Sequence, residues 1–336
     1  MSKFLFRVDD GPGIGAGHLM RCLALAEAAH EHGGTVRLCT ARPSPLHTRW
    51  LDFGAQIHVR EREVGGTDDL AQTLQQVREF DADWLVIDGY GFATPWLDAA
   101  AGACRVLCLD DLGNRDAAVQ LMLNHNPGAE HRYGARYRRC GRALLGLDWF
   151  LLRREWCEVQ RATLPGRLVL TLGGEDPGDR MLALMQALLA DGRAFVADVV
   201  CSAPEAGFQR ALEMAKLHPE RFTVHRAPVA LPPLMRRAAA AISGGGVTPI
   251  EAASLGVPSI IVVLADNQQP GAEYLGAAGA ARVLSFCDGA LVSAARSALD
   301  LLDDDMTRSA MTLRGRALID GAGPARVLAA MMEKSE

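Results

Sequence analysis

The stretch Gly11-Pro12-Gly13-Ile14-Gly15-Ala16-Gly17-His18-Leu19-Met20-Arg21-Cys22 places a glycine run between an apolar segment and a helical pattern. Residues 4–8 are mostly apolar and read as a buried strand, whereas apolar residues from Leu19 to Ala29 recur at helical spacing. The glycines therefore occupy a strand-to-helix turn. Such a turn lets the backbone approach a ligand closely and directs the free N–H groups of a helix start toward it.

His18 falls at the predicted helix start. Its imidazole titrates near neutral pH, and the positive end of the helix dipole favours the neutral form. A neutral imidazole at the mouth of an anion site suits a general base, although a surface histidine in an ordinary α/β turn is the structural alternative. The loop does not match the dinucleotide fingerprint, because its glycines at 13, 15 and 17 are spaced differently from Gly-x-Gly-x-x-Gly. It is not a Walker loop either, because no Lys-Ser or Lys-Thr follows the glycines.

The composition limits the class of protein. A chain of 336 residues is long enough for two domains, and a net charge of −5 provides no basic field for nucleic acid. The longest apolar runs, such as residues 259–265, are far shorter than a membrane span, and the first residues lack a signal-peptide layout. The eight cysteines are scattered among apolar neighbours, which indicates reduced core residues. We expect a cytoplasmic protein without membrane insertion and make no prediction of protein partners.

The first half alternates apolar strands with helical patterns, which predicts a doubly wound parallel sheet. Strands are expected at 35–40, 55–59, 84–88, 105–109 and 120–123, and helices at 46–53 and 67–80. Ligands of such sheets collect outside the carboxyl ends of the strands. Polar residues stand at the ends of three of these strands and of the strand at 4–8, and so predict one edge of a cleft: Asp9-Asp10, Asp88-Gly89-Tyr90-Gly91, Asp110-Asp111 and Asn124-His125-Asn126.

The second half repeats this architecture after the turn Leu164-Pro165-Gly166. We therefore predict two domains, 1–163 and 164–336, with the last helix able to pack back on the first. Three strands of the second half, at 168–172, 239–243 and 259–264, end in residues suited to a ligand site. These endings are Gly173-Gly174-Glu175-Asp176-Pro177, Gly244-Gly245-Gly246-Val247-Thr248 and Ala265-Asp266-Asn267-Gln268.

The triple glycine before a helix predicts a diphosphate site, because its N–H groups and the helix dipole offset negative charge without a metal. Glu251 lies three positions after Thr248, which fits a capping box equally well as a ligand for ribose hydroxyls. Asn267 and Gln268 offer donors and acceptors to a nucleotide, or serve as turn residues.

In combination these motifs resemble the PseG-like hydrolases of nonulosonic acid biosynthesis, which share a two-domain fold with the MurG-type glycosyltransferases. The likeness extends from near the amino terminus to about residue 284 and rests on several segments. They are Ile14-Gly15-Ala16-Gly17-His18-Leu19-Met20-Arg21-Cys22, Asp88-Gly89-Tyr90, Leu109-Asp110-Asp111, Leu145-Gly146, Leu151-Leu152-Arg153, Leu172-Gly173-Gly174-Glu175-Asp176-Pro177, Ser243-Gly244-Gly245-Gly246-Val247-Thr248-Pro249-Ile250-Glu251, Leu255-Gly256-Val257-Pro258 and Ala265-Asp266-Asn267-Gln268.

The resemblance implies the GT-B architecture, in which two Rossmann-like domains face a cleft. It also implies hydrolysis of UDP-2,4-diacetamido-2,4,6-trideoxy-β-L-altrose to UDP and the free sugar destined for pseudaminic acid. The family's catalytic histidine maps to His18, and the tyrosine of its Asp-x-Tyr motif maps to Tyr90. The UDP site maps to Ser243, Gly244, Gly245, Gly246, Val247, Thr248, Glu251, Asn267 and Gln268. Further substrate contacts are predicted at Asp10, Gly15, Gly17, Arg21, Gly173 and Gly174, and neither a metal nor another cofactor is expected.

The expected chemistry follows from the leaving group. UDP departs without protonation, so the reaction needs donors for the diphosphate and a base for water. We expect His18 to activate the water, Tyr90 to orient His18 or the water, and attack opposite UDP to invert the anomeric centre. Three alternatives stay open: a glycosyltransferase of the same fold, an epimerase that alters C2 of the sugar, and a binding protein without turnover.

Overall fold

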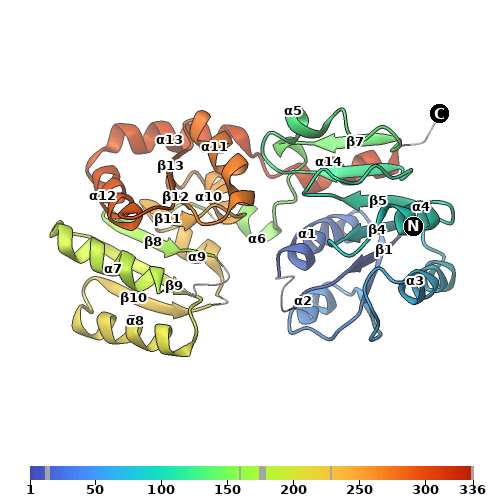
Figure 1. The fold of residues 1–336 in the computed structure, drawn as a ribbon, viewed down its shortest axis with the longest axis horizontal. Helices are drawn as coiled ribbons and strands as arrows, with labels where there is room; N and C mark the ends of the chain where they lie inside the picture. Colours follow the sequence, from blue (N-terminus) through green and yellow to red (C-terminus); the bar gives the residue numbers. More distant parts are fainter. Residues whose placement is uncertain (12–15, 159, 174–178, 228, 334–336) are drawn as a thin grey trace. The chain divides into compact units, whose positions relative to one another are not determined.

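The computed structural model describes residues 1–11, 16–158, 160–173, 179–227 and 229–333. The chain divides into two compact α/β units (Figure 1): unit 1 comprises Met1–Arg154 and Gly321–Glu336, and unit 2 comprises Glu155–Asp320. The chain first passes from unit 1 to unit 2 after Arg154, a few residues before the division that the sequence predicts after residue 163. The reason is that backbone N–H groups of Ala162 and Leu164 donate to carbonyls of Arg236 and Arg237, which bind this segment to unit 2.

The described part of unit 1 contains a seven-stranded sheet in which every neighbouring pair is parallel. The strand order is β3-β2-β1-β4-β5-β6-β7. The strands are β1 (Lys3–Val8), β2 (Thr35–Thr40), β3 (Gln56–Val59), β4 (Trp84–Asp88), β5 (Arg105–Leu109), β6 (Leu121–Asn124) and β7 (Arg142–Leu145). The helices are α1 (Gly17–Glu31), α2 (His47–Asp52), α3 (Thr67–Phe80), α4 (Thr94–Ala101), α5 (Ala129–Tyr133), η1 (Leu147–Trp149) and α14 (Gly323–Met332), with α6 (Arg154–Cys157) at the crossing.

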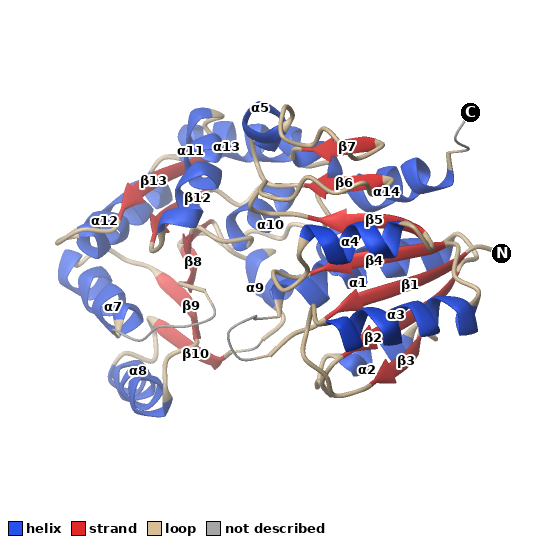
Figure 2. Cartoon of the chain, turned by 45° about the vertical axis from the view of Figure 1, so that its right-hand side comes forward, coloured by secondary structure: helices blue, strands red, loops and turns tan. Residues whose placement is uncertain are grey.

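Helices cover both faces of this sheet, which is why its strands are almost continuously apolar. Alternate residues of β1, Phe4 and Phe6, pack with α1, α2 and α14. Leu5 points to the opposite face and packs with α3 and α4, which Figure 2 shows lying against that side of the sheet. Leu328 and Met331 of α14 are part of the unit 1 core, so the last helix completes the first unit rather than the second.

Unit 2 repeats the topology with a six-stranded parallel sheet of order β10-β9-β8-β11-β12-β13 in its described residues. The strands are β8 (Arg167–Thr171), β9 (Val196–Cys201), β10 (Phe222–Arg226), β11 (Ala240–Gly244), β12 (Ser259–Val263) and β13 (Ala281–Ser285). The helices are α7 (Arg180–Asp191), α8 (Glu205–Leu217), α9 (Leu231–Met235), α10 (Thr248–Leu255), η2 (Asp266–Gln268), α11 (Gln269–Ala277), α12 (Ala290–Asp303) and α13 (Asp305–Leu318). Across the described residues of both units, every helix is too short or too polar to traverse a bilayer.

Both sheets reverse their strand order at a central pair of strands, β1 with β4 in unit 1 and β8 with β11 in unit 2. Ligands of open α/β sheets bind outside the carboxyl ends of the strands at such a reversal. The fold therefore provides one candidate ligand-binding edge in each unit.

Candidate active site

The carboxyl edge of the unit 1 sheet holds a histidine paired with a carboxylate. His18 lies in the first turn of α1, and Asp88 is the last residue of β4. The Nδ1 atom of His18 is 2.7 Å from Oδ1 of Asp88, and the His18 side chain keeps 7 % of its surface exposed. The predicted catalytic histidine is therefore enclosed by polar partners rather than by an apolar core.

Arg21 fixes the charge of Asp88. Its Nε donates to Oδ2 of Asp88 and its Nη2 to Oδ1, both at 2.6 Å. Burial alone would raise the pKa of Asp88, but the charge and hydrogen bonds of Arg21, with a smaller contribution from His18, hold that pKa well below its usual range. Asp88 is therefore a carboxylate at physiological pH, which accepts hydrogen bonds and donates none.

The ionised Asp88 determines the tautomer of His18. Because the carboxylate only accepts, Nδ1 of His18 carries the hydrogen and a neutral ring has its lone pair on Nε2. Arg21 Nη2 is also 2.9 Å from Nδ1, a proximity that arises because both nitrogens donate to the same Asp88 oxygen. Among the described residues, Nε2 of His18 has no protein partner. This atom is not fully buried, so solvent reaches it. This arrangement presents a base.

Tyr90 and Asp111 complete the surroundings of His18. The Tyr90 ring meets the His18 ring edge to face, with centroids 4.8 Å apart and an interplanar angle of 88°. Its hydroxyl donates to Asp111 Oδ2 at 3.4 Å, and the residue is 55 % exposed. Arg21 Nη1 and Asn126 Nδ2 donate to Asp111 Oδ1 at 2.7 and 3.1 Å. The predicted residues His18, Arg21 and Tyr90 thus form one cluster.

The charge of this cluster indicates the kind of ligand that it accepts. Asp88 and Asp111 carry two negative charges, because the positive charge of Arg21 also lowers the pKa of Asp111 against the effect of burial. Among the described residues that bind these two carboxylates, Arg21 supplies the compensating positive charge, and its guanidinium is committed to both of them. A net negative cluster favours positive charge developing on a substrate and disfavours a phosphate group.

The sequence did not assign roles to Asp88, Asp111 or Asn126, although it placed all three at strand ends. The signal that identifies them is the adjacency of β4, β5 and β6, whose polar endings meet at one sheet edge.

The remaining predicted contacts of unit 1 are Asp10, Gly15 and Gly17. Asp10 accepts a hydrogen bond from Ser44 at 2.5 Å, and among the described residues no hydrogen bond or ion pair joins it to the His18 cluster. Nothing among the described residues lies within 4 Å of the position of a Cβ on Gly17, so packing there does not require glycine. Gly15 lies outside the described residues. Substrate binding by these residues stays a prediction.

In unit 2, the glycine turn between β11 and α10 presents free backbone donors. Within the described residues, the N–H groups of Gly246, Val247 and Thr248 have no hydrogen-bond partner. Gly244 requires its lack of a side chain, because a Cβ there would lie 2.8 Å from the carbonyl oxygen of Leu172. The turn therefore combines close backbone packing with three donors at a helix start, which is the arrangement that binds a diphosphate.

Gln268 supports this turn from within the protein. Its Oε1 accepts hydrogen bonds from the backbone of Gly245 at 3.1 Å and Leu264 at 2.9 Å. The side-chain amide predicted to contact the nucleotide thus joins the glycine turn to the end of β12, and the N–H of Gly245 is occupied. Its neighbour Asn267 is exposed and has no hydrogen-bond partner among the described residues.

The capping-box interpretation of Glu251 is wrong. Helix α10 begins at Thr248 itself, Val247 takes the cap position, and no side-chain hydrogen bond caps the helix. Glu251 is buried in the first turn of α10. Ser243, at the end of β11, is buried with its hydroxyl unpartnered among the described residues. Gly173 follows β8 with a φ of +106°, which favours glycine, and Gly174 lies outside the described residues.

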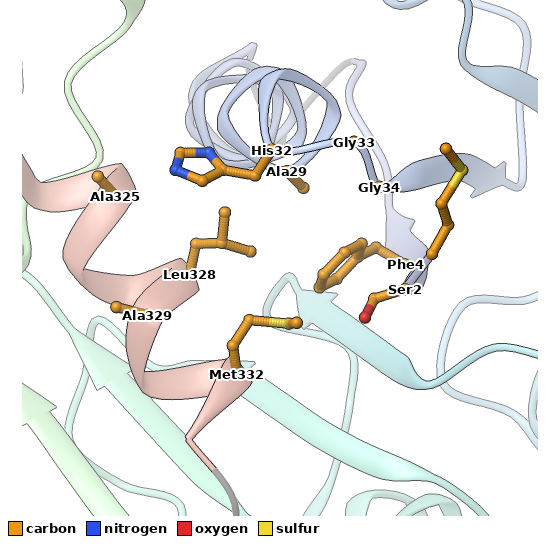
Figure 3. Close-up of a pocket in the computed structure, with 11 residues that line it drawn as sticks. Ser2, Phe4, Ala29, His32, Gly33, Gly34, Ala325, Leu328, Ala329 and Met332 are labelled. Atoms are coloured by element: carbon orange, nitrogen blue, oxygen red, sulfur yellow. The ribbon is translucent and has the colours of Figure 1, made fainter.

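A separate cavity of about 600 Å³ lies in unit 1 between the start of β1, the end of α1 and α14 (Figure 3). Phe4, Leu328 and Met332 supply apolar walls. The cavity lies at the amino edge of the sheet, whereas the His18 cluster lies at the carboxyl edge. It is therefore distinct from the candidate active site. No group of His, Cys, Asp and Glu side chains suited to a metal ion occurs in the described ranges.

Three solved structures show the fold that this chain shares. MurG from Acinetobacter baumannii aligns with a TM-score of 0.66 and 15% identity over 99% of this chain and 100% of that one. UDP-GlcNAc 2-epimerase from Neisseria meningitidis, bound to UDP-GlcNAc, aligns with a TM-score of 0.67 and 12% identity over 99% of this chain and 100% of that one. The calicheamicin glycosyltransferase CalG4 aligns with a TM-score of 0.63 and 17% identity over 100% of both chains.

No protein-family profile matches the chain, and no curated protein sequence does. Identities this low establish architecture alone. The prediction of two Rossmann-like domains of the GT-B fold is confirmed. The solved neighbours are glycosyltransferases and sugar-nucleotide epimerases.

Proposed function

We propose that this protein hydrolyses a UDP-linked diacetamido-trideoxy sugar to UDP and the free sugar, as its resemblance to the PseG-like hydrolases implies. The observation that carries the proposal is the 2.7 Å contact between His18 Nδ1 and the ionised Asp88, with Nε2 left without a partner in the part of the chain that the structure describes. A base held in this way accepts a proton from water and is stabilised by the carboxylate once it is charged.

In the proposed step, a water oxygen attacks the anomeric carbon while one water proton passes to His18 Nε2. The bond between the anomeric carbon and the diphosphate oxygen breaks, and its electron pair leaves with UDP. The proton then returns from His18 to solvent. Attack from the face opposite UDP inverts the anomeric centre. The net negative charge of Asp88, Asp111 and Arg21 stabilises the positive charge that develops on the sugar ring.

Unit 2 binds the departing UDP in this proposal. The free N–H groups of Gly246, Val247 and Thr248 are donors for the diphosphate oxygens. The exposed amide of Asn267 is a further candidate for a nucleotide contact, whereas the hydroxyl of Ser243 is fully buried. Because these groups offset the charge of UDP, the reaction requires no protonation of the leaving group.

Two predicted residues take more specific roles. We assign Arg21 as a positioning residue, since its guanidinium holds the two carboxylates rather than a phosphate. The half-exposed Tyr90 ring contacts His18 and offers a flat surface for the sugar, while its hydroxyl remains bonded to Asp111.

Glycosyl transfer is the second candidate function, and the names of the solved neighbours favour it. The same Nε2 would deprotonate an acceptor hydroxyl instead of water. The two reactions therefore differ in the molecule that receives the sugar, not in the base.

The test is to incubate the protein with a panel of UDP-sugars in water, including UDP-2,4-diacetamido-2,4,6-trideoxy-β-L-altrose, and to measure free UDP and the anomer formed by NMR. The proposal expects UDP release without an acceptor and an inverted first product. His18→Ala should lower the rate at least about a hundredfold. His131→Ala is the matched control, because His131 is a surface histidine. UDP release only after an acceptor is added would establish the transferase, and a C2-altered sugar would establish an epimerase.

A further inference from the structure

A second histidine, His125, borders the same sheet edge and has the opposite tautomer. It follows β6 and is buried, with 4 % of its surface exposed. Its Nδ1 accepts the backbone N–H of Leu151 at 3.1 Å, and its ring lies against Phe150 with centroids 4.9 Å apart. Because Nδ1 accepts this hydrogen bond, the ring hydrogen of neutral His125 is on Nε2.

His125 remains neutral at physiological pH. Burial, reinforced by the positive charge of Arg21, lowers the pKa of His125 to about 4. It therefore serves neither as a general base through Nδ1, which is occupied, nor as a proton donor near pH 7. Its remaining capacity is to donate one hydrogen bond from Nε2.

That donor belongs to the His18 cluster. Strand β6 lies beside β5, and Asn126, the residue after His125, donates to Asp111 Oδ1 at 3.1 Å. The charges of Arg21, Asp111 and His18 all act on the His125 ring. In the part of the chain that the structure describes, Nε2 of His125 has no hydrogen-bond partner. This atom is not fully buried, so it is accessible to a small ligand.

We propose that His125 binds the sugar, its Nε2–H donating a hydrogen bond to an uncharged sugar oxygen, either a hydroxyl or an amide carbonyl. This inference rests on the proposed function. An uncharged acceptor is favoured because Asp88 and Asp111 disfavour a phosphate oxygen at this edge. The two imidazoles therefore have different roles. Asp88 binds Nδ1 of His18, so Nε2 of His18 accepts a proton from water. The Leu151 N–H binds Nδ1 of His125, so Nε2 of His125 donates to the sugar.

Two substitutions separate the two nitrogens of His125. In His125→Asn, the amide oxygen replaces Nδ1 as acceptor for Leu151, but the Nε2–H donor is lost. In His125→Gln, the longer amide supplies a donor near the position of Nε2, but the Leu151 N–H loses its partner. The pair therefore distinguishes a contribution to substrate binding from a contribution to the fold.

The experiment measures kcat and KM for both variants with whichever UDP-sugar of the panel the wild type hydrolyses, together with thermal unfolding. We expect His125→Asn to unfold within a few degrees of wild type and to lose about tenfold in kcat/KM. His125→Gln should unfold at a lower temperature and retain kcat/KM within about threefold. As a readout independent of turnover, nitrogen-15 NMR of the histidines should show the His125 hydrogen on Nε2 from about pH 5.5 to 8.

A folded His125→Asn variant with wild-type kcat and KM would overturn this inference while leaving the proposed function intact. An NMR signal that places the His125 hydrogen on Nδ1 would overturn it as well. If the wild type releases UDP from none of the sugars with or without an acceptor, the proposed function fails, and this inference fails with it.

Discussion

Replacing Asp88 by asparagine tests the central geometric argument, because the change removes a charge and keeps the shape. The asparagine oxygen would keep the hydrogen bond that Arg21 Nε now donates to Oδ2 at 2.6 Å, while Arg21 Nη2 would lose its present acceptor, Oδ1. The amide nitrogen would then face Nδ1 of His18 and donate to it. His18 would carry its hydrogen on Nε2 and lose the lone pair that the proposed reaction requires.

The expected loss is large. In serine proteases, the same substitution at the aspartate behind the catalytic histidine lowers kcat about 10⁴-fold. A loss of about 10³ to 10⁴ in kcat for Asp88→Asn corresponds to about 4 to 5.5 kcal/mol of transition-state stabilisation. KM should change little, because the base contributes to the transition state rather than to ground-state binding.

The protein should remain folded. Removing one partner of a buried ion pair costs about 3 to 5 kcal/mol. Arg21 retains Asp111 at 2.7 Å, so we expect the lower end of that range, about 3 kcal/mol. Total stabilities of about 5 to 15 kcal/mol tolerate such a loss.

The assay is steady-state release of UDP, with thermal unfolding measured on the same samples. Asp98→Asn is the matched control, because Asp98 pairs with Arg139 on the surface at 2.8 Å. The double variant of His18→Ala and Asp88→Asn should be no slower than His18→Ala alone, since residues that act as a unit are not additive. A folded Asp88→Asn enzyme that keeps more than about a tenth of wild-type kcat, or effects that multiply in the double variant, would refute the reasoning.

Three further predictions concern charge and the nucleotide site. Arg21→Gln removes the largest opposition to the effect of burial on Asp88 and leaves the smaller one from His18, so the pKa of Asp88 should rise and the acidic limb of the pH profile of kcat/KM should move to higher pH; an unmoved limb would contradict the role of Arg21. Because the folded-state pKa of His125, about 4, lies below its unfolded value near 6.5, His125 stabilises the fold fully above about pH 6.5 and loses this contribution as the pH falls to about 4. Wild type should therefore lose roughly 3 kcal/mol more than His125→Asn over that interval, as measured by urea unfolding at each pH. Gln268→Glu still accepts from Gly245 but adds a negative charge beside the turn, so its affinity for UDP by calorimetry should fall about tenfold, whereas unchanged affinity would place the diphosphate elsewhere.

The sequence predicts the strands well where burial on both faces produces continuous apolar runs. The strands at 35–40, 84–88 and 105–109 have the predicted bounds, because their residues leave little choice of conformation. Strands β7 and β13 were not predicted. β7 lies at a sheet edge, begins with Arg142 and has only four residues, so its periodicity is too short to identify.

The candidate site shows which of its contacts follow from residue spacing on a helix and which follow from strand order. His18 and Arg21 are three residues apart on one helix, so their side chains share a face, and Asp88 binds both. The helix pattern alone places the imidazole beside the guanidinium. It does not identify the carboxylate between them, which ends β4 and is separated from His18 by 70 residues. Only the pairing of β1 with β4 brings that strand end to the start of α1.

The position of Gln268 shows why a motif does not by itself assign a role. A side-chain amide after a buried strand offers the same donors and acceptors whether it meets a nucleotide or its own backbone. The sequence left both uses open, and the two hydrogen bonds to Gly245 and Leu264 favour the second. In the proposed function, Gln268 then affects nucleotide binding through the shape of the glycine turn. Its replacement should weaken UDP binding without removing a direct contact, whereas replacing the exposed Asn267 by alanine would remove only a side chain that has no structural partner among the described residues. A stability loss confined to Gln268→Leu, together with loss of UDP affinity in both variants, is the combination that this division of roles requires.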